Sequence, residues 1–275
     1  MLAQQDLIQS VSNSIAKLGV SNRNCSICGQ LVEAKLVDLP GIGQRMVGIA
    51  CICETKQLKQ EEKMAARRER NGYLHTFSDD DQMVANATFD KFELEQGTTS
   101  GYRIAKDFAQ NLVAWGPRGF YFCGDNGCGK SHLLSSITVH LRKNGFAVIY
   151  TTGKTLIQRA KPAMSKAEVL EAYRNCDVLI IDEIGADVPA DWEIGDLFTA
   201  MNSRQGRKPI LYGSNLSIDE LEAKMNAKQA GWGTRLMERI IADTVGQIMM
   251  QGESRRFDKH VENQAWLQGR LNQGV

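Results

Sequence analysis

Short apolar runs separated by longer mixed segments dominate the chain from about residue 88 onward. Five of these runs have the length and the content of β-branched and aromatic residues that are typical of strands. The intervening segments are rich in helix formers, and one of them begins with the capping-box pattern Ser217-Ile218-Asp219-Glu220. This alternation predicts an α/β domain with a central, five-stranded parallel sheet flanked by helices. The predicted strands are 120–123, 147–151, 178–181, 210–213 and 245–250.

A glycine-rich segment follows the first predicted strand and precedes a helix-compatible segment. Its pattern, GxxxxGKS, is that of a phosphate-binding loop. Glycines let the backbone turn tightly, so that several N–H groups point toward a phosphate, and the helix N-terminus adds partial positive charge. Lys130 is expected to reach the β- and γ-phosphates of ATP, and the Ser131 hydroxyl to bind Mg²⁺. The alternative is a glycine-rich turn that matches by chance. The loop comprises Gly124, Asp125, Asn126, Gly127, Cys128, Gly129, Lys130 and Ser131.

The predicted strand 178–181 is wholly apolar and is followed directly by Asp182 and Glu183. Such a run is typical of a strand buried on both faces, and ligands of parallel sheets bind at the carboxyl ends of the strands. We therefore expect Asp182 to hold Mg²⁺ and Glu183 to orient or deprotonate the water that attacks the γ-phosphate. The alternative is a strand that simply ends in exposed acids.

Two further segments contain polar residues that could contact the γ-phosphate. Asn215 follows the strand 210–213, where it could bind the attacking water, although Asn is also common in turns. Arg235 and Arg239 are four positions apart and share one face of a predicted helix. Arginines so placed usually form surface salt bridges. Their functional interpretation is stabilisation of transition-state charge across a subunit boundary.

Four cysteines lie close together near the N-terminus, Cys25 and Cys28 as CxxC, and Cys51 and Cys53 as CxC. Two such pairs can present four thiolates tetrahedrally to Zn²⁺, which forms a closed structural site. The segment 29–50 predicts a hairpin or loop that is too poor in apolar residues to fold without a metal. Reduced thiols without a metal are the alternative.

The segment 54–70 is rich in helix formers and in charges of both signs, which predicts a solvated linker helix. The following segment, 71–86, has little periodicity and is interpreted as a flexible joint. The predicted organisation is a zinc-binding module at 1–54, a helical and flexible linker at 55–87, and an ATPase domain at 88–275.

Composition limits the class of protein. The 275-residue chain has a formal net charge of +1, so contacts with DNA would depend on local basic patches. Residues 1–20 lack the features of a secretion signal, and no apolar run approaches the ~20 residues needed to span a bilayer. A cytoplasmic location without membrane contact is expected. In a reducing compartment, the seven cysteines favour metal or packing roles over disulfides.

Together these motifs resemble those of helicase loaders of the DnaC/DnaI type, in the AAA+ ATPase superfamily. The resemblance covers roughly residues 88–256, through TFDKF, GDNGCGKS, VLIIDEIG, GSNLS, GTRLMERI and GESRR in the family's order. It implies an AAA+ fold and a sensor role for Asn215. It also implies a trans-acting arginine finger at Arg239, with Arg235 as a competing candidate, and a second-sensor arginine at Arg256, which binds nucleotide.

The cysteine-containing module is similar to the zinc-binding, helicase-contacting domain of DnaI-like loaders. It differs in lacking a proline after the first cysteine and in the long loop between the cysteine pairs. The resemblance further implies that single-stranded DNA binds in a central channel. The helix expected after the second strand, with Lys154, Arg159 and Lys161, is the candidate DNA contact.

The function implied by the resemblance is ATP-dependent helicase loading. Subunits would bind ATP and Mg²⁺, self-associate into an AAA+ oligomer, hold single-stranded DNA and deliver a DnaB-type hexameric replicative helicase, hydrolysing ATP to ADP and phosphate. An IstB-like transposition helper ATPase could share every ATPase motif and is the main alternative. A small-metabolite kinase is disfavoured by the Asp182-Glu183 pair, and a zinc adaptor that only binds nucleotide would release no phosphate.

Overall fold

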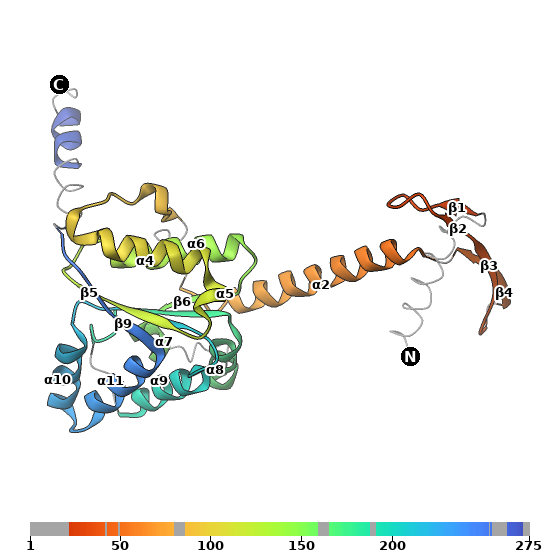
Figure 1. Ribbon diagram of the computed structural model, residues 1–275. Helices are drawn as coiled ribbons and strands as arrows, with labels where there is room; N and C mark the ends of the chain where they lie inside the picture. The colour runs from red at the N-terminus through yellow and green to blue at the C-terminus, as the bar shows by residue number, and fades with distance from the viewer. Residues whose placement is uncertain are drawn as a thin grey trace. The chain divides into compact units, whose positions relative to one another are not determined.

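The computed structural model describes residues 22–41, 43–48, 50–79, 86–158, 165–187, 191–252, 254 and 263–271. The chain forms two compact units, Met1–Arg67 and Arg68–Val275 (Figure 1). Helix α2 (Ile52–His75) contributes its first residues to one unit and its last residues to the other.

The first unit contains two small antiparallel strand pairs, β1 with β2 and β3 with β4. The second pair is a hairpin, one of the two alternatives, hairpin or loop, that the sequence predicted within 29–50. Among the described residues of this unit, Cys25 and Val32 are the buried apolar side chains. So little apolar burial stabilises a fold weakly, which is the usual reason for a small module to depend on a metal. The strands are β1 (Arg23–Asn24), β2 (Leu31–Val32), β3 (Ala34–Leu39) and β4 (Gly43–Gly48).

The second unit is built on a five-stranded parallel sheet with the strand order β6-β7-β8-β5-β9. Every strand lies within one residue of its predicted bounds, because each is an apolar run enclosed by turn-forming residues. The order places β5, which leads into the glycine-rich loop, between β8 and β9. The strands are β5 (Gly119–Gly124), β6 (Val148–Thr152), β7 (Val178–Asp182), β8 (Ile210–Gly213) and β9 (Thr244–Met250).

Side chains alternate between the two faces of this sheet, so each face has its own hydrophobic core. Phe120 and Phe122 of β5 enter one core, whereas Tyr121 and Cys123 enter the other. Figure 1 shows helices on both faces of the sheet. Helices α4 (Thr99–Gln110) and α6 (Lys130–Lys143) cover the first face, and α8 (Lys166–Asn175), α9 (Asp191–Arg204), α10 (Ile218–Lys228) and α11 (Trp232–Asp243) cover the second. The shorter helices are η1 (Phe89–Lys91), η2 (Gln96–Thr98), α5 (Leu112–Trp115) and α7 (Gly153–Gln158).

Residues 70–79, which we call the strap, belong to the second unit and pack along its outer strand β6. The sequence predicted a flexible joint over 71–86, but the described part of that segment is docked. Leu74 and Phe77 are buried, with 3% and 1% of their surface exposed, and the Asp79 N–H donates to the Tyr150 carbonyl at 2.7 Å. Three apolar residues, Tyr73, Leu74 and Phe77, in a polar segment are too few to show a clear period, so the sequence pattern did not reveal this docking.

Candidate nucleotide site and cysteine cluster

The glycine-rich loop connects the carboxyl end of β5 to the first residue of α6, as a phosphate-binding loop requires. Lys130 is the first residue of that helix and is 6% exposed. Its Nζ donates to the carbonyls of Gly124 and Asp125, at 2.8 and 2.7 Å, so the ammonium group lies inside the loop. A Cβ at Gly124 would come within 1.8 Å of the Met250 carbonyl, and φ is +131° there. This position therefore needs glycine.

Asp182 ends β7 and is almost completely buried, with 2% of its surface exposed. Its Oδ2 accepts from the Tyr150 hydroxyl at 2.5 Å, and its Oδ1 accepts from the Glu183 N–H at 2.9 Å. A Cβ at Gly213 on β8 would come within 2.1 Å of Oδ1. Glycine at the end of β8 therefore leaves the space that the Asp182 carboxylate occupies.

The same tyrosine connects Asp182 to the glycine-rich loop. Burial raises the pKa of Tyr150, the Asp182 carboxylate raises it further, and the neighbouring Ser135 and Ser131 hydroxyls lower it. The Tyr150 hydroxyl is bonded to Asp182, and Ser131 lies in the vicinity of the same phenol group. A serine hydroxyl beside a carboxylate is a set of hard oxygen ligands that suits Mg²⁺, so these residues fit the metal that a bound nucleotide triphosphate would require.

Glu183 lies next to this site, and its side chain is exposed. Its backbone has φ +55°, in the left-handed region that non-glycine residues rarely adopt. Backbone strain of this kind is concentrated at functional sites. Asn215 is also exposed, in the residues that follow β8. Both residues therefore emerge beyond the carboxyl ends of neighbouring strands.

The two candidate arginines on α11 differ in their surroundings. Arg235 is exposed. The Arg239 guanidinium lies 4.4 Å from the centroid of the Phe198 ring and donates to Asn202 Oδ1 at 2.8 Å. Arg239 is therefore held against α9 of its own chain by a cation–π contact and a hydrogen bond.

Of four other predicted residues, three lie outside the part of the chain that the structure describes. Arg256 lies outside the described residues, as do Arg159 and Lys161. Lys154 on α7 is exposed and pairs with Asp187 at 3.5 Å. Sequence reasoning missed Tyr150, because β6 also contains the hydroxyls of Thr151 and Thr152, so nothing in the run distinguished the tyrosine.

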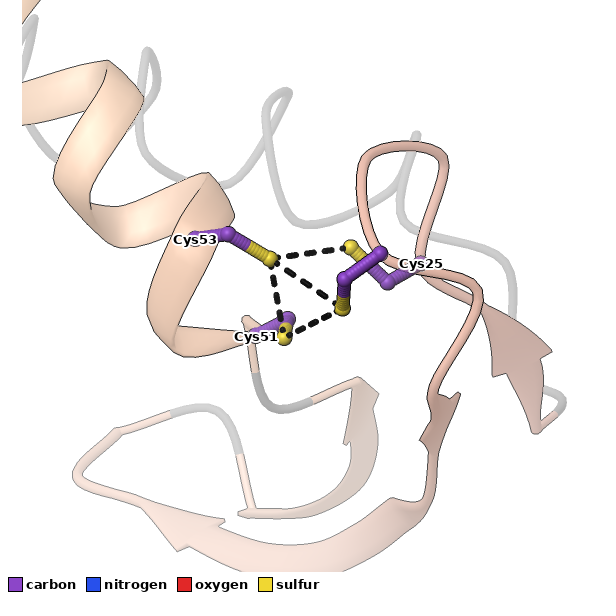
Figure 2. A group of neighbouring side chains, drawn as sticks. Cys25, Cys51 and Cys53 are labelled. Atoms are coloured by element: carbon purple, nitrogen blue, oxygen red, sulfur yellow. Dashed lines mark hydrogen bonds between the residues drawn. The ribbon is translucent and has the colours of Figure 1, made fainter.

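The four N-terminal cysteines form a compact cluster, with all four Sγ atoms within 4.8 Å of one another. Cys25 and Cys28 lie in the turn between β1 and β2, Cys51 directly precedes α2, and Cys53 lies in its first turn. Figure 2 shows the sulfur atoms of Cys25, Cys51 and Cys53 directed toward one another, with the Cys51–Cys53 pair at 3.2 Å. Four converging thiols fit a tetrahedral zinc site.

Hydrogen bonds within the cluster make its thiols unequal. Hydrogen bonds from the Cys53 backbone and side chain lower the pKa of Cys51 to about 7. The same pairing raises the pKa of Cys53 to about 12. Cys51 therefore forms a thiolate, which is the state that binds a metal, more readily than Cys53.

An ion pair that the sequence did not reveal supports the cluster. Arg23 donates to both carboxylate oxygens of Glu54, at 2.5 and 2.7 Å, and the Cys51 N–H donates to Glu54 at 3.0 Å. The Arg23 guanidinium lowers the pKa of Glu54 to about 2. This bidentate pair connects β1 to the start of α2 and so holds the two cysteine pairs together.

Removal of a bound metal is expected to unfold the first unit selectively. Purified protein should contain about one zinc per chain, as a four-thiolate site requires. A zinc chelator, or the double substitution Cys25→Ser with Cys51→Ser, should abolish amide-exchange protection across 22–48 and leave the β5–β9 sheet protected. Hydrogen exchange with mass spectrometry measures both regions in one sample. Metal-free protein that keeps full protection across 22–48 would contradict the zinc assignment.

Comparison with known proteins places this site in a family. A family model described as "IstB-like ATP binding protein" matches residues 54–263, more than half of the chain. The chain belongs to this family. It is 29% identical over 119 residues to the replicative helicase loader DnaC of Buchnera aphidicola subsp. Baizongia pistaciae, covering 41% of this chain and 48% of that protein.

Two further comparisons agree with this placement. The chain is 24% identical over 166 residues to the replicative helicase loader DnaC of Escherichia coli K12, covering 56% of this chain and 63% of that protein. Its fold matches the solved structure titled "Crystal Structure of the DnaI" with a TM-score of 0.56 and 22% identity, over 65% of this chain and 95% of that chain. The chain therefore spans about half the length of the first curated relative and has the AAA+ fold.

These findings confirm the predicted fold class and the resemblance to loaders of the DnaC/DnaI type. Within the described residues, no helix is both long and apolar enough to cross a lipid bilayer.

Proposed function

We propose that this chain is an ATP-dependent loader of a hexameric, DnaB-type replicative helicase, acting in DNA replication in the cytoplasm. The observation that carries the proposal is the glycine-rich loop that encloses the Lys130 ammonium group, together with the buried Asp182 carboxylate at the carboxyl end of β7. This arrangement supports binding of a nucleoside triphosphate with its metal. The similarity to curated replicative helicase loaders supports the process in which it is used.

In this function each of the described site residues has its own role in binding or hydrolysing ATP. Lys130 would exchange its carbonyl partners for phosphate oxygens, and the loop N–H groups would hold the β-phosphate. Ser131 and Asp182 would hold Mg²⁺, which neutralises developing charge on the phosphates when bound. Glu183 would orient or deprotonate the attacking water, and Asn215 would contact that water or the γ-phosphate. Hydrolysis to ADP and phosphate would follow.

We further propose that nucleotide state controls association between copies of this chain in an AAA+ oligomer. An arginine from one subunit would complete the ATP site of its neighbour, and Arg256 would contact the nucleotide in its own subunit. For Arg239 to act across the boundary, its contacts with Phe198 and Asn202 would have to exchange for phosphate contacts. Arg235 starts from an exposed position.

Replacing Arg239 by alanine is expected to preserve ATP binding and to reduce assembly-dependent hydrolysis by about 100-fold or more, since trans-acting arginines contribute strongly to phosphoryl transfer. Mixing these subunits with Lys130→Ala subunits, which retain the arginine, should restore part of the rate. Phosphate release in the presence of single-stranded DNA and helicase is the measurement. A normal rate for Arg239→Ala, with a loss for Arg235→Ala, would transfer the role to Arg235.

The first unit would provide the surface that docks on the helicase, stabilised by Zn²⁺ at the cysteine cluster. The proposed organisation is the module 1–54, the linker 55–87 and the ATPase domain 88–275. Single-stranded DNA would contact the helix that includes Lys154, together with Arg159 and Lys161.

Co-purification with candidate partners tests the proposed function. The full-length chain, supplied with ATP or ADP, should retain a DnaB-type helicase in a nucleotide-dependent manner. Membership in the IstB-like family supports a second candidate, a transposition helper ATPase. Retention of a transposase and not of a helicase would establish that alternative. Phosphate transfer to a small metabolite, or the absence of DNA-stimulated phosphate release, would contradict both candidates.

A further inference from the structure

Strand β6 is an outer strand of the sheet, and the strap pairs with it at one residue in particular. The Tyr150 N–H donates to the Ser78 hydroxyl at 2.8 Å, and the Tyr150 carbonyl accepts from the Asp79 N–H at 2.7 Å. Both backbone polar groups of Tyr150 are therefore bonded by the strap. Asp79 also accepts from the Thr151 hydroxyl at 2.9 Å and so extends the contact by one residue.

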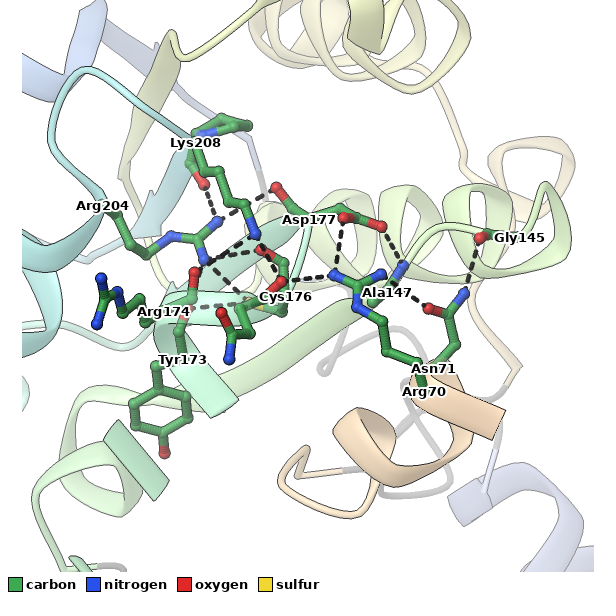
Figure 3. A network of polar contacts seen from close by, with 12 residues as sticks. Arg70, Asn71, Gly145, Ala147, Tyr173, Arg174, Cys176, Asp177, Arg204 and Lys208 are labelled. Atoms are coloured by element: carbon green, nitrogen blue, oxygen red, sulfur yellow. Dashed lines mark hydrogen bonds and ion pairs between the residues drawn. The ribbon is translucent and has the colours of Figure 1, made fainter. Parts of the chain in front are cut away.

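The strap is anchored independently of these contacts. Arg70 donates to the Asn175 carbonyl at 2.7 Å and pairs with Asp177 at 3.3 Å, and Asn71 donates to the Gly145 carbonyl at 2.7 Å. Figure 3 shows Arg70 directed toward Asp177 and Asn71 directed toward Gly145. With the burial of Leu74 and Phe77, these bonds fix the beginning of the strap before it reaches β6.

The side chain of Tyr150 carries the connection to the nucleotide site. Tyr150 is 4% exposed, and its hydroxyl donates to Asp182 Oδ2 at 2.5 Å. Oδ1 of the same carboxylate accepts from the Glu183 N–H. Two donors on different atoms fix the rotation of a carboxylate about its Cβ–Cγ bond, because each oxygen then has its own partner. Without the phenol hydroxyl, Oδ2 would lose its fixed position.

We propose that Tyr150 is a positioning residue for the magnesium-holding carboxylate of Asp182, and that the docked strap sets the position of Tyr150. The affinity for Mg²⁺ with nucleotide then depends on whether residues 76–79 are docked on β6. This inference rests on the proposed role of Asp182 in holding Mg²⁺. Through Tyr150, residues 76–79, which directly follow α2, would then affect the ATP site.

The substitution Tyr150→Phe tests the positioning role. Binding of a fluorescent ATP analogue to the full chain is titrated with Mg²⁺ and repeated in EDTA. We expect the Mg²⁺ concentration for half-maximal binding to rise by about tenfold, the effect of losing one hydrogen bond to a charged group. Binding in EDTA should stay unchanged, because Lys130 and the loop N–H groups need no metal. An unchanged Mg²⁺ requirement would overturn the inference.

Tyr121→Phe is the matched control. Tyr121 is a buried strand tyrosine whose hydroxyl donates to the Leu216 carbonyl at 2.8 Å, and it belongs to the core on the other face of the sheet. This variant also loses one hydrogen bond of a buried tyrosine, so its melting temperature should fall, while its Mg²⁺ requirement should stay that of the wild type. If Tyr121→Phe raised the Mg²⁺ requirement as much as Tyr150→Phe does, general destabilisation would explain both effects. That result would overturn the inference.

A double-mutant cycle tests the strap. Ser78→Ala should raise the Mg²⁺ requirement by about threefold, a smaller effect because it acts through Tyr150. In a chain that already carries Tyr150→Phe, Ser78→Ala should raise the Mg²⁺ requirement little further. If the two substitutions instead multiplied the Mg²⁺ requirement independently, the proposed role of the strap would be wrong. A wild-type chain that binds no nucleotide at any Mg²⁺ concentration would instead contradict the proposed function, so the two failures are distinguishable.

Discussion

Lys130→Ala is expected to weaken ATP binding by about 100-fold or more. The Lys130 ammonium group lies inside the glycine-rich loop, bonded to the Gly124 and Asp125 carbonyls. In the nucleotide complex it would instead donate to phosphate oxygens, and hydrogen bonds between charged groups contribute about 1.5–3 kcal/mol each. Losing two such hydrogen bonds therefore corresponds to a loss of ATP affinity of about 100-fold or more. Titration calorimetry with ATP and Mg²⁺ measures the change.

Lys143→Ala is the control for this experiment. Lys143 is an exposed residue in the last turn of the same helix, so its removal takes away the same charge at the end distant from the loop. ATP affinity should stay within about twofold of the wild type, as expected for a screened surface charge. Equal losses of affinity in both variants, or wild-type affinity in Lys130→Ala, would contradict the assignment of the loop.

Glu183→Gln is expected to separate ATP binding from hydrolysis. Glutamine has the same shape but cannot accept a proton, so the attacking water would lose its base. General base catalysis contributes about 10²- to 10⁴-fold to a rate, and a loss of that size is expected in phosphate release. Nucleotide affinity should be unchanged, because the Asp182 carboxylate and the loop are intact. The variant should therefore accumulate bound ATP.

Asp187→Asn provides the comparison, because Asp187 is an exposed acid a few residues further along the chain and pairs with Lys154. Its removal should leave phosphate release near the wild-type rate. If Glu183→Gln also hydrolysed ATP within about threefold of the wild-type rate, another group would have to activate the water, and the assignment of Glu183 would be wrong.

The sequence by itself determined the parts of this protein that have a local signature. The five strands are apolar runs between turn formers, and the glycine-rich loop is a continuous motif, so both were predicted closely. The pairing of Asp182 with Glu183 at a strand end was visible for the same reason. The cysteine pairs were recognisable because two short spacings allow four thiols to converge, and the structure brings their sulfur atoms together. The roles of these residues in catalysis and metal binding stay predictions.

Only the tertiary structure decided which distant residues meet. Tyr150 reaches Asp182 because β6 and β7 are parallel neighbours whose register pairs Thr152 with Asp182. The strap lies on β6 because Leu74 and Phe77 bury their side chains there, although the surrounding polar residues hide any period. Arg23 on β1 and Glu54 on α2 likewise form an ion pair, although the β3–β4 hairpin lies between them in the chain. Contacts of this kind depend on strand order, register and burial. These act between residues far apart in the chain, so they produce no local sequence pattern around either residue.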